Sequence, residues 1–214
     1  MEYTLGEEIV NSITHGIGAL LSIAALVLMI VFAAINGTAW HVVSVSIYGS
    51  TLFILYLMST LYHAITNKKA KKVFKIIDHS SVYLLIAGTY TPYSLVVLRQ
   101  DSYKGWVVFG VIWAMAILGI TLYAVFKNRI KILNVISYVV MGWVIVFAFP
   151  DLLRIMTENN AIGGIYWLFA GGIFYTVGVI FYAIKKVRYF HSIWHIFVLL
   201  GSICHFFSVL FYVI

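Results

Sequence analysis

Charged residues are scarce in this chain of 214 residues, and their scarcity sets its class. Asp, Glu, Lys and Arg together make up 10% of the sequence, whereas hydrophobic residues make up 63%. Soluble domains usually carry about 25% charged residues. A water-soluble fold is therefore excluded, and we expect an integral protein of the cell membrane whose partners are membrane lipids.

Cysteine and proline are nearly absent. The single cysteine, Cys204, excludes an intramolecular disulfide and any cysteine-rich metal site, so a metal ion would need His, Asp or Glu as ligands. Only two prolines interrupt the chain, which leaves room for long helices and little loop, and we expect one domain over residues 1–214. The first eight residues are acidic where a secretory signal is basic, so no cleaved leader is expected.

The sequence consists mainly of long apolar segments. Each is close to the roughly 20 residues that cross a hydrocarbon core of about 30 Å. They are continuously apolar, whereas the strands of a membrane barrel alternate apolar and polar residues. The sequence thus predicts an all-α integral membrane protein, a seven-transmembrane helix bundle. The expected spans are approximately 17–35, 40–63, 78–98, 105–126, 132–149, 162–184 and 190–213.

The positive charges gather in alternate loops. Of the 14 Lys and Arg residues, 11 lie between spans two and three, four and five, or six and seven. By the positive-inside rule these loops face the cytoplasm, so we expect a cytoplasmic N-terminus and an extracytoplasmic C-terminus. This pattern explains the net charge of +7 as an orientation signal, and no nucleic-acid partner is expected. The 11 residues are Lys68, Lys69, Lys71, Lys72, Lys75, Lys127, Arg129, Lys131, Lys185, Lys186 and Arg188.

Three histidines are expected at one membrane depth. His191 and His195 are four residues apart, so they share a helical face about 6 Å apart along the axis. His63 ends the second span at the same expected depth. Three imidazoles leave one position of a tetrahedral zinc ion for water, the pattern of catalytic sites. The alternative is that each histidine is a core residue that bonds a neighbouring helix.

A carboxylate and a hydroxyl accompany these histidines. Asp78 begins the third span at the same depth, where it is placed to orient a ligand or to accept a proton from water. Ser59 lies one turn before His63 and is expected to hydrogen-bond in the same pocket. Asp78 and Ser59 are thus the candidate catalytic residues.

The sequence has further polar residues within or beside the spans. Glu8, Asn11 and His15 share one face of a predicted helix ahead of the first span, which is either an amphipathic interfacial helix or a support for the pocket. His205 lies about 15 Å beyond His195 along the last span, and we expect it to hydrogen-bond a neighbouring helix. His41 and His79 are expected to be interfacial.

Together these motifs resemble those of the bacterial hemolysin III family, a branch of the progestin and adipoQ receptors, which include the adiponectin receptors. The resemblance implies seven helices with a cytoplasmic N-terminus. It also implies that His63, His191 and His195 bind zinc, with Asp78 near the metal-bound water and Ser59 lining the site. The motifs are Glu8-x-x-Asn11-x-x-Thr14-His15, Ser59-x-x-x-His63, Asp78 leading into Gly88-Thr89-Tyr90-Thr91-Pro92, and His191-x-x-x-His195.

Two functions are compatible with these residues. The first is a zinc-dependent intramembrane hydrolase of a lipid amide or ester, a class favoured by the similarity of the superfamily's motifs to those of alkaline ceramidases. In it, zinc would lower the pKa of its water towards about 7, and Asp78 would take the proton. The alternative is a non-enzymatic membrane-state sensor or a channel-like cytolytic protein with structural zinc.

Overall fold

The computed structural model describes residues 3–100 and 103–214, and within them the predicted all-α, seven-helix architecture is confirmed. Seven helical segments are long and apolar enough to cross a membrane. Five of them are single helices, and the third and fifth contain shorter pieces. The helices are α1 (Leu5–Asn36), α2 (Ala39–Ala64), α3 (Lys68–Pro92), α4 (Lys104–Phe126), α5 (Lys131–Gly142), α6 (Phe149–Glu158), α7 (Gly163–Ala183) and α8 (Phe190–Tyr212).

Several helices begin before the apolar segments that predicted them. The Thr4 hydroxyl accepts a hydrogen bond from the Glu7 N–H at 3.3 Å, and the Glu7 carboxylate accepts one from the Thr4 N–H at 2.9 Å. This reciprocal cap starts α1 at Leu5 and carries the polar lead-in into the first span. The side-chain oxygen of Asn67 caps α3 by accepting hydrogen bonds from the N–H groups of Lys69 and Ala70. The lysines expected in a loop therefore lie in the first turns of α3.

Both prolines coincide with irregular helical geometry. Pro92 ends α3 and is followed by a π-helical turn over Tyr93–Val97 and a 3₁₀ turn over Leu98–Gln100. Pro150 lies in the first turn of α6, after a 3₁₀ segment over Val144–Ala148. Because proline lacks an N–H and its ring collides with the preceding turn, the helix has to be rebuilt at each position. The fifth span, Ile132–Glu158, is broken for this reason.

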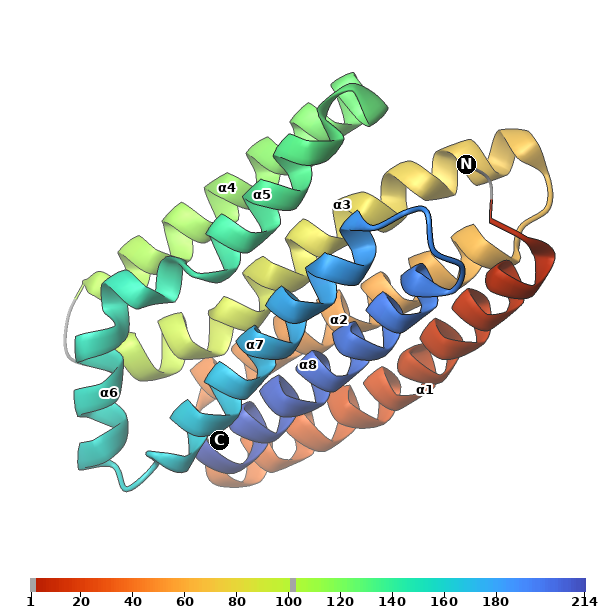
Figure 1. Cartoon of the computed structure of the whole chain (residues 1–214). Coiled ribbons are helices and arrows are strands. Elements are labelled where there is room, and N and C mark those ends of the chain that lie inside the picture. The colour runs from red at the N-terminus through yellow and green to blue at the C-terminus, as the bar shows by residue number, and fades with distance from the viewer. Residues whose placement is uncertain (1–2, 101–102) are drawn as a thin grey trace.

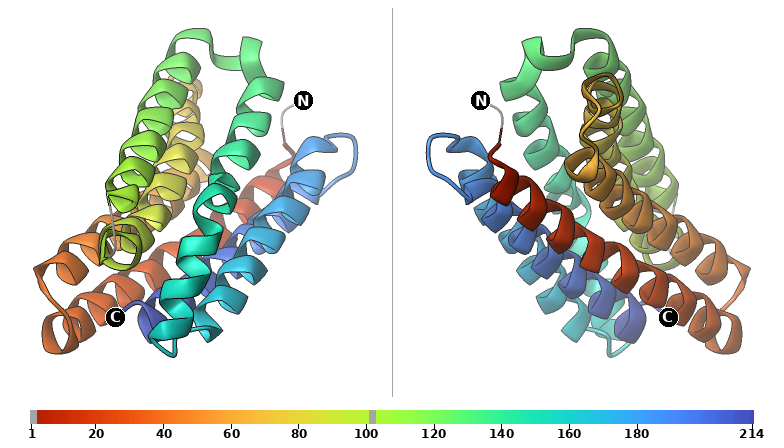
Figure 2. Two further views of the ribbon diagram at one scale, coloured as in Figure 1. Left: turned by 90° about the vertical axis from the view of Figure 1, so that its left-hand side faces the viewer. Right: turned by 90° about the vertical axis from the view of Figure 1, so that its right-hand side faces the viewer.

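The third span is the most enclosed part of the bundle. In its most apolar window 83% of the residues are buried, against 22% for the fourth, fifth and sixth spans. The views agree that α2 lies beside α1 and α3, and that α8 lies between α1 and α7 (Figures 1 and 2). The two termini lie at opposite ends of the bundle (Figure 1). Residues from α1, α2, α3 and α8 can therefore meet near one end.

Small residues allow these helices to approach closely. A side chain at Gly18 of α1 would overlap the Tyr56 ring of α2. Between α2 and α3, a side chain at Gly88 would overlap Thr51 in the same way. Because lipid tails are as apolar as the helices, association in the membrane relies on such close packing and on hydrogen bonds between helices.

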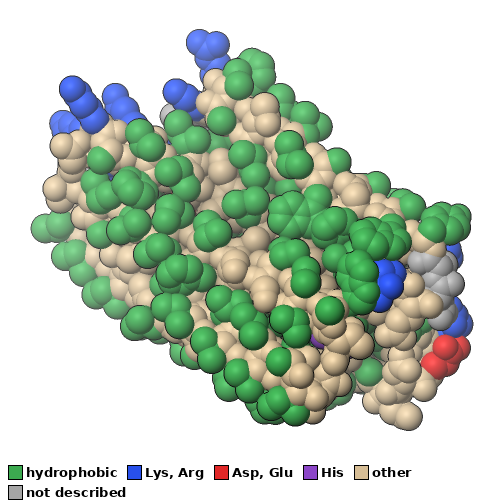
Figure 3. Space-filling model, turned by 180° about the vertical axis from the view of Figure 1, so that it is seen from behind, with side chains coloured by type: hydrophobic (Ala, Val, Ile, Leu, Met, Phe, Trp, Pro, Cys, Tyr) green, Lys and Arg blue, Asp and Glu red, His purple; other side chains and the backbone are tan. Residues whose placement is uncertain are grey.

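The outer surface has the polarity of a membrane protein. Hydrophobic side chains cover the middle of the face seen in Figure 3, and Lys and Arg side chains gather towards its ends. Large apolar residues of α1 and α4, such as Leu20 and Ile117, are exposed. The side chain of Lys131, one of the predicted loop cations, lies outside the described part of the structure.

The close packing of α2 and α3 predicts that a single added methyl group lowers the stability of the protein. Gly88→Ala places a methyl against Thr51, and overpacking of this kind costs about 1–3 kcal/mol of stability. We therefore expect a lower midpoint of thermal unfolding in detergent. Gly110→Ala is the matched control, because nothing lies within 4 Å of the added methyl. Equal midpoints for the two variants would contradict the packing of α2 on α3.

Candidate metal centre

The three predicted ligands meet at one end of the bundle. His63 lies in the last turn of α2, and His191 and His195 lie in the first two turns of α8. One nitrogen from each ring can be chosen so that all three atoms lie within 4.8 Å of one another. The Nε2 atoms of His191 and His195 are 3.1 Å apart. The histidines that are far apart in the sequence thus form one cluster within metal-binding distance.

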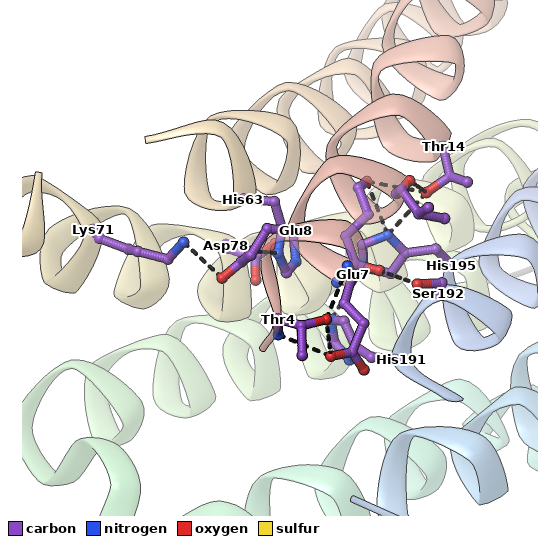
Figure 4. A network of polar contacts seen from close by, with 12 residues as sticks. Thr4, Glu7, Glu8, Thr14, His63, Lys71, Asp78, His191, Ser192 and His195 are labelled. Carbon is purple, nitrogen blue, oxygen red and sulfur yellow. Dashed lines mark hydrogen bonds and ion pairs between the residues drawn. The ribbon is translucent and has the colours of Figure 1, made fainter. Parts of the chain in front are cut away.

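His63 is oriented by a carboxylate. Its Nδ1 donates a hydrogen bond to Glu8 Oε2 at 2.6 Å, since a carboxylate only accepts. The other carboxylate oxygen, Glu8 Oε1, accepts from Lys71 Nζ at 2.7 Å. In the neutral ring Nε2 then carries the lone pair, and this buried atom has no hydrogen-bond partner among the described residues. Its lone pair is available to a metal ion. Figure 4 shows this chain of contacts.

His195 is oriented by the backbone of α1. Its Nδ1 lies 3.2 Å from the Asn11 carbonyl oxygen and 3.3 Å from Thr14 Oγ1. Donation to the carbonyl places the lone pair on Nε2, on the side of His191. The His15 ring stacks on the His195 ring at a centroid distance of 3.5 Å. Hydrogen bonds of this kind fix the tautomer and direction of metal-ligating histidines.

The cluster fits a metal ion. Two nitrogens that share a tetrahedral zinc at about 2.0–2.1 Å lie roughly 3.3 Å apart, close to the 3.1 Å between His191 and His195. The orphaned Nε2 of His63 completes a set of three imidazole donors, a set that suits zinc and other transition metals. Three nitrogens also leave one tetrahedral position open.

Ser59 and Asp78 border the same cavity as His191 and His195. Ser59 is buried, with 2% of its surface exposed. Asp78 Oδ2 lies 3.2 Å from His79 Nδ1. Both residues therefore line the cavity that these histidines border. Asp78 was expected to begin the third span, but it lies inside α3, which already begins at Lys68.

The cavity continues from the cluster into the bundle. It runs between α3, α5, α7 and α8 and is lined mostly by apolar side chains, with Leu168 and His205 at its far end. His205 is about 15 Å from His195 along α8. Its Nε2 donates to the Leu168 carbonyl oxygen of α7 at 3.1 Å, which confirms the predicted interhelical bond. The cavity thus extends along α8 from His191 to His205 and is mostly apolar.

Comparison with known proteins identifies the family. A family model described as Haemolysin-III related matches residues 3–206. The chain belongs to this haemolysin-III-related family. The Hemolysin-3 homolog of Bacillus subtilis (strain 168) is 48% identical over 210 residues, which cover 98% of this chain and 96% of the relative. Hemolysin-3 of Bacillus cereus is 48% identical over 208 residues, 97% of this chain and 92% of the relative.

A more distant relative is an animal protein. The human Monocyte to macrophage differentiation factor is 28% identical over 216 residues, which cover 96% of this chain and 84% of the relative. These matches confirm the resemblance drawn from the motifs. Together with the seven helices they make this haemolysin-III-related chain a multi-pass membrane protein.

The structure also resolves the two readings of the N-terminal motif. Glu8, Asn11 and His15 belong to the first membrane-length helix, and all three contact the histidine cluster. Asn11 Oδ1 further accepts from the Ser192 hydroxyl of α8 at 2.6 Å. Of the two readings that the spacing left open, these contacts favour a helix that packs against the pocket over a separate interfacial helix.

Two aromatic or histidine contacts were not predicted. His79, expected to be interfacial, borders the cavity, and its ring stacks on Tyr123 of α4 at 5.1 Å. The Tyr3 ring stacks on His191 at 4.8 Å, and burial raises the pKa of its phenol. No local sequence pattern indicates either contact, because each partner comes from another helix or from an irregular segment.

The ligand set predicts that substitution of a cluster histidine removes the metal and that substitution of His205 does not. We expect about one zinc ion per purified chain, lost in His195→Ala because two imidazoles bind zinc far more weakly than three. His205→Ala is the control, since His205 lies outside the cluster. Mass spectrometry of metal content in detergent checks both variants. Equal loss in the two would show that the ligand set is wrong.

Proposed function

We propose that this protein is a zinc-dependent intramembrane hydrolase that cleaves a lipid amide or ester. The observation that carries the proposal is the position of the histidine cluster at one end of a long, mostly apolar cavity. An open metal position beside Ser59 and Asp78 suits catalysis, whereas a structural zinc site has four protein ligands. The names of the relatives state no reaction, and the support for this chemistry comes from the residues of the site.

His63, His191 and His195 would hold the zinc. When bound there, zinc lowers the pKa of water to about 7 and polarises a carbonyl group. The remaining steps belong to the protein. Asp78, which lines the cavity together with His191 and His195, would act as the general base. The Ser59 hydroxyl supplies a hydrogen bond to the polar group of the substrate.

The cavity selects the class of substrate. Its apolar walls favour a hydrocarbon chain, which would lie along α8 between the cluster and His205. The scissile amide or ester would then lie beside the histidines. Lys71 is at the same end of the bundle as the cluster. By the positive-inside rule this end faces the cytoplasm, so the headgroup would come from the cytoplasmic leaflet.

The proposed role of Asp78 separates catalysis from zinc binding. We expect Asp78→Asn to keep zinc and to lose hydrolysis by about 10²–10⁴-fold, the usual contribution of a general base. The measurement compares free fatty acid and lipid classes in extracts of cells that express the parent or the variant. Asp151→Asn is the control, because Asp151 pairs with Lys104 away from the cluster.

The same experiment tests the non-enzymatic alternative. A rise in free fatty acid with the parent and with Asp151→Asn, but not with Asp78→Asn, supports hydrolysis. If the parent holds zinc and no lipid class changes, hydrolysis is contradicted. The protein would then fit a membrane-state sensor or a cytolytic protein with structural zinc.

A further inference from the structure

We infer that Glu8 is a positioning residue of the metal centre, which sets metal affinity by fixing the tautomer of His63 and adding negative charge behind it. This inference rests on the metal centre of the proposed function. Glu8 belongs to α1, a helix that contributes no member of the ligand cluster. Its role is therefore distinct from that of a ligand.

The contact between Glu8 and His63 is short and enclosed. The two atoms, His63 Nδ1 and Glu8 Oε2, are 2.6 Å apart, and the exposed fraction is 0% for the His63 side chain and 16% for that of Glu8. If Nε2 of His63 carried the proton instead, the lone pair on Nδ1 would face the carboxylate, and these two groups would repel each other. Glu8 thus selects the form of His63 whose lone pair faces the cluster. Negative charge behind the ring also makes Nε2 a stronger donor to a metal.

The carboxylate is itself held in place. Lys71 Nζ, from α3, binds its second oxygen at 2.7 Å, so the two oxygens have separate partners on α2 and α3. Rotation of the carboxylate would break both bonds. The first turn of α1 is fixed independently, because Glu7 Oε1 accepts from the Tyr189 N–H just before α8 at 2.9 Å. Glu7 and Glu8 are neighbours in sequence with different partners (Figure 4).

This difference supplies a matched control. Glu8→Gln keeps the size of the side chain and one oxygen acceptor but removes the charge at His63. Glu7→Gln removes the neighbouring charge and leaves the contact with His63 intact. A purely structural role of Glu8, as a bridge between α1, α2 and α3, would change thermal stability and leave metal affinity unchanged.

The test measures metal binding directly on full-length protein in detergent. Zinc affinity is obtained by competition with a chelator, and bound Co²⁺ reports ligand geometry through its visible absorption. We expect Glu8→Gln to weaken zinc binding by about 10–100-fold, the usual cost of losing such a partner, and to alter the Co²⁺ spectrum. Glu7→Gln is expected to bind zinc as the parent does.

A second variant covers the case in which Glu8→Gln does not fold. Glu8→Asp keeps the charge for Lys71 but withdraws the carboxylate from His63 by one methylene, so zinc affinity should again fall, by less. Parent-like zinc affinity and Co²⁺ spectrum in either folded variant would overturn the role of Glu8 while the metal centre stands. If the parent itself binds no zinc, the metal centre and the role of Glu8 both fail.

Discussion

In hydrocarbon, a polar side chain has to find its partner within the protein, because no water is there to supply one. The end of the bundle that holds the histidines meets this requirement with a connected set of contacts. Lys71, Glu8 and His63 form one chain across three helices, and the Asn11 carbonyl binds His195. The arrangement of α1, α2, α3 and α8 depends on these contacts, since each of these helices carries at least one of the groups.

These contacts leave one buried nitrogen atom of the cluster without a hydrogen-bond partner in the described part of the chain. Once the outer nitrogens of His63 and His195 are used, their Nε2 atoms point into the cluster, and that of His63 has no partner among the described residues. A buried polar atom without a partner costs about 1–3 kcal/mol, and a bound metal ion would remove that cost. The same bonds that tie the helices together thus prepare the site for a metal.

The packing of the bundle is close on one side and leaves a cavity on the other. Helices α1, α2 and α3 approach closely through positions such as Gly18 and Gly88. On the other side, α5 and α7 stand around an apolar space that ends at His205. The closely packed half carries most of the polar cluster, and the other half borders the mostly apolar cavity.

The sequence by itself determined the elements whose signals are local. Apolar segments of membrane-spanning length predict the seven helices, and the four-residue spacing of His191 and His195 places both rings on one face of α8. His63, Ser59 and Asp78 could be added because the basic loops indicate which ends of the spans lie on the same side of the membrane.

Only the tertiary structure decided which groups from different helices touch. The bond between Glu8 and His63, the stacking of His79 on Tyr123 and the stacking of Tyr3 on His191 join residues from separate segments. Spacing along one helix determines which residues share a face, but the rotation and approach of two helices depend on the packing of all the side chains between them. The partners of a polar residue are therefore set by the bundle and not by its own segment.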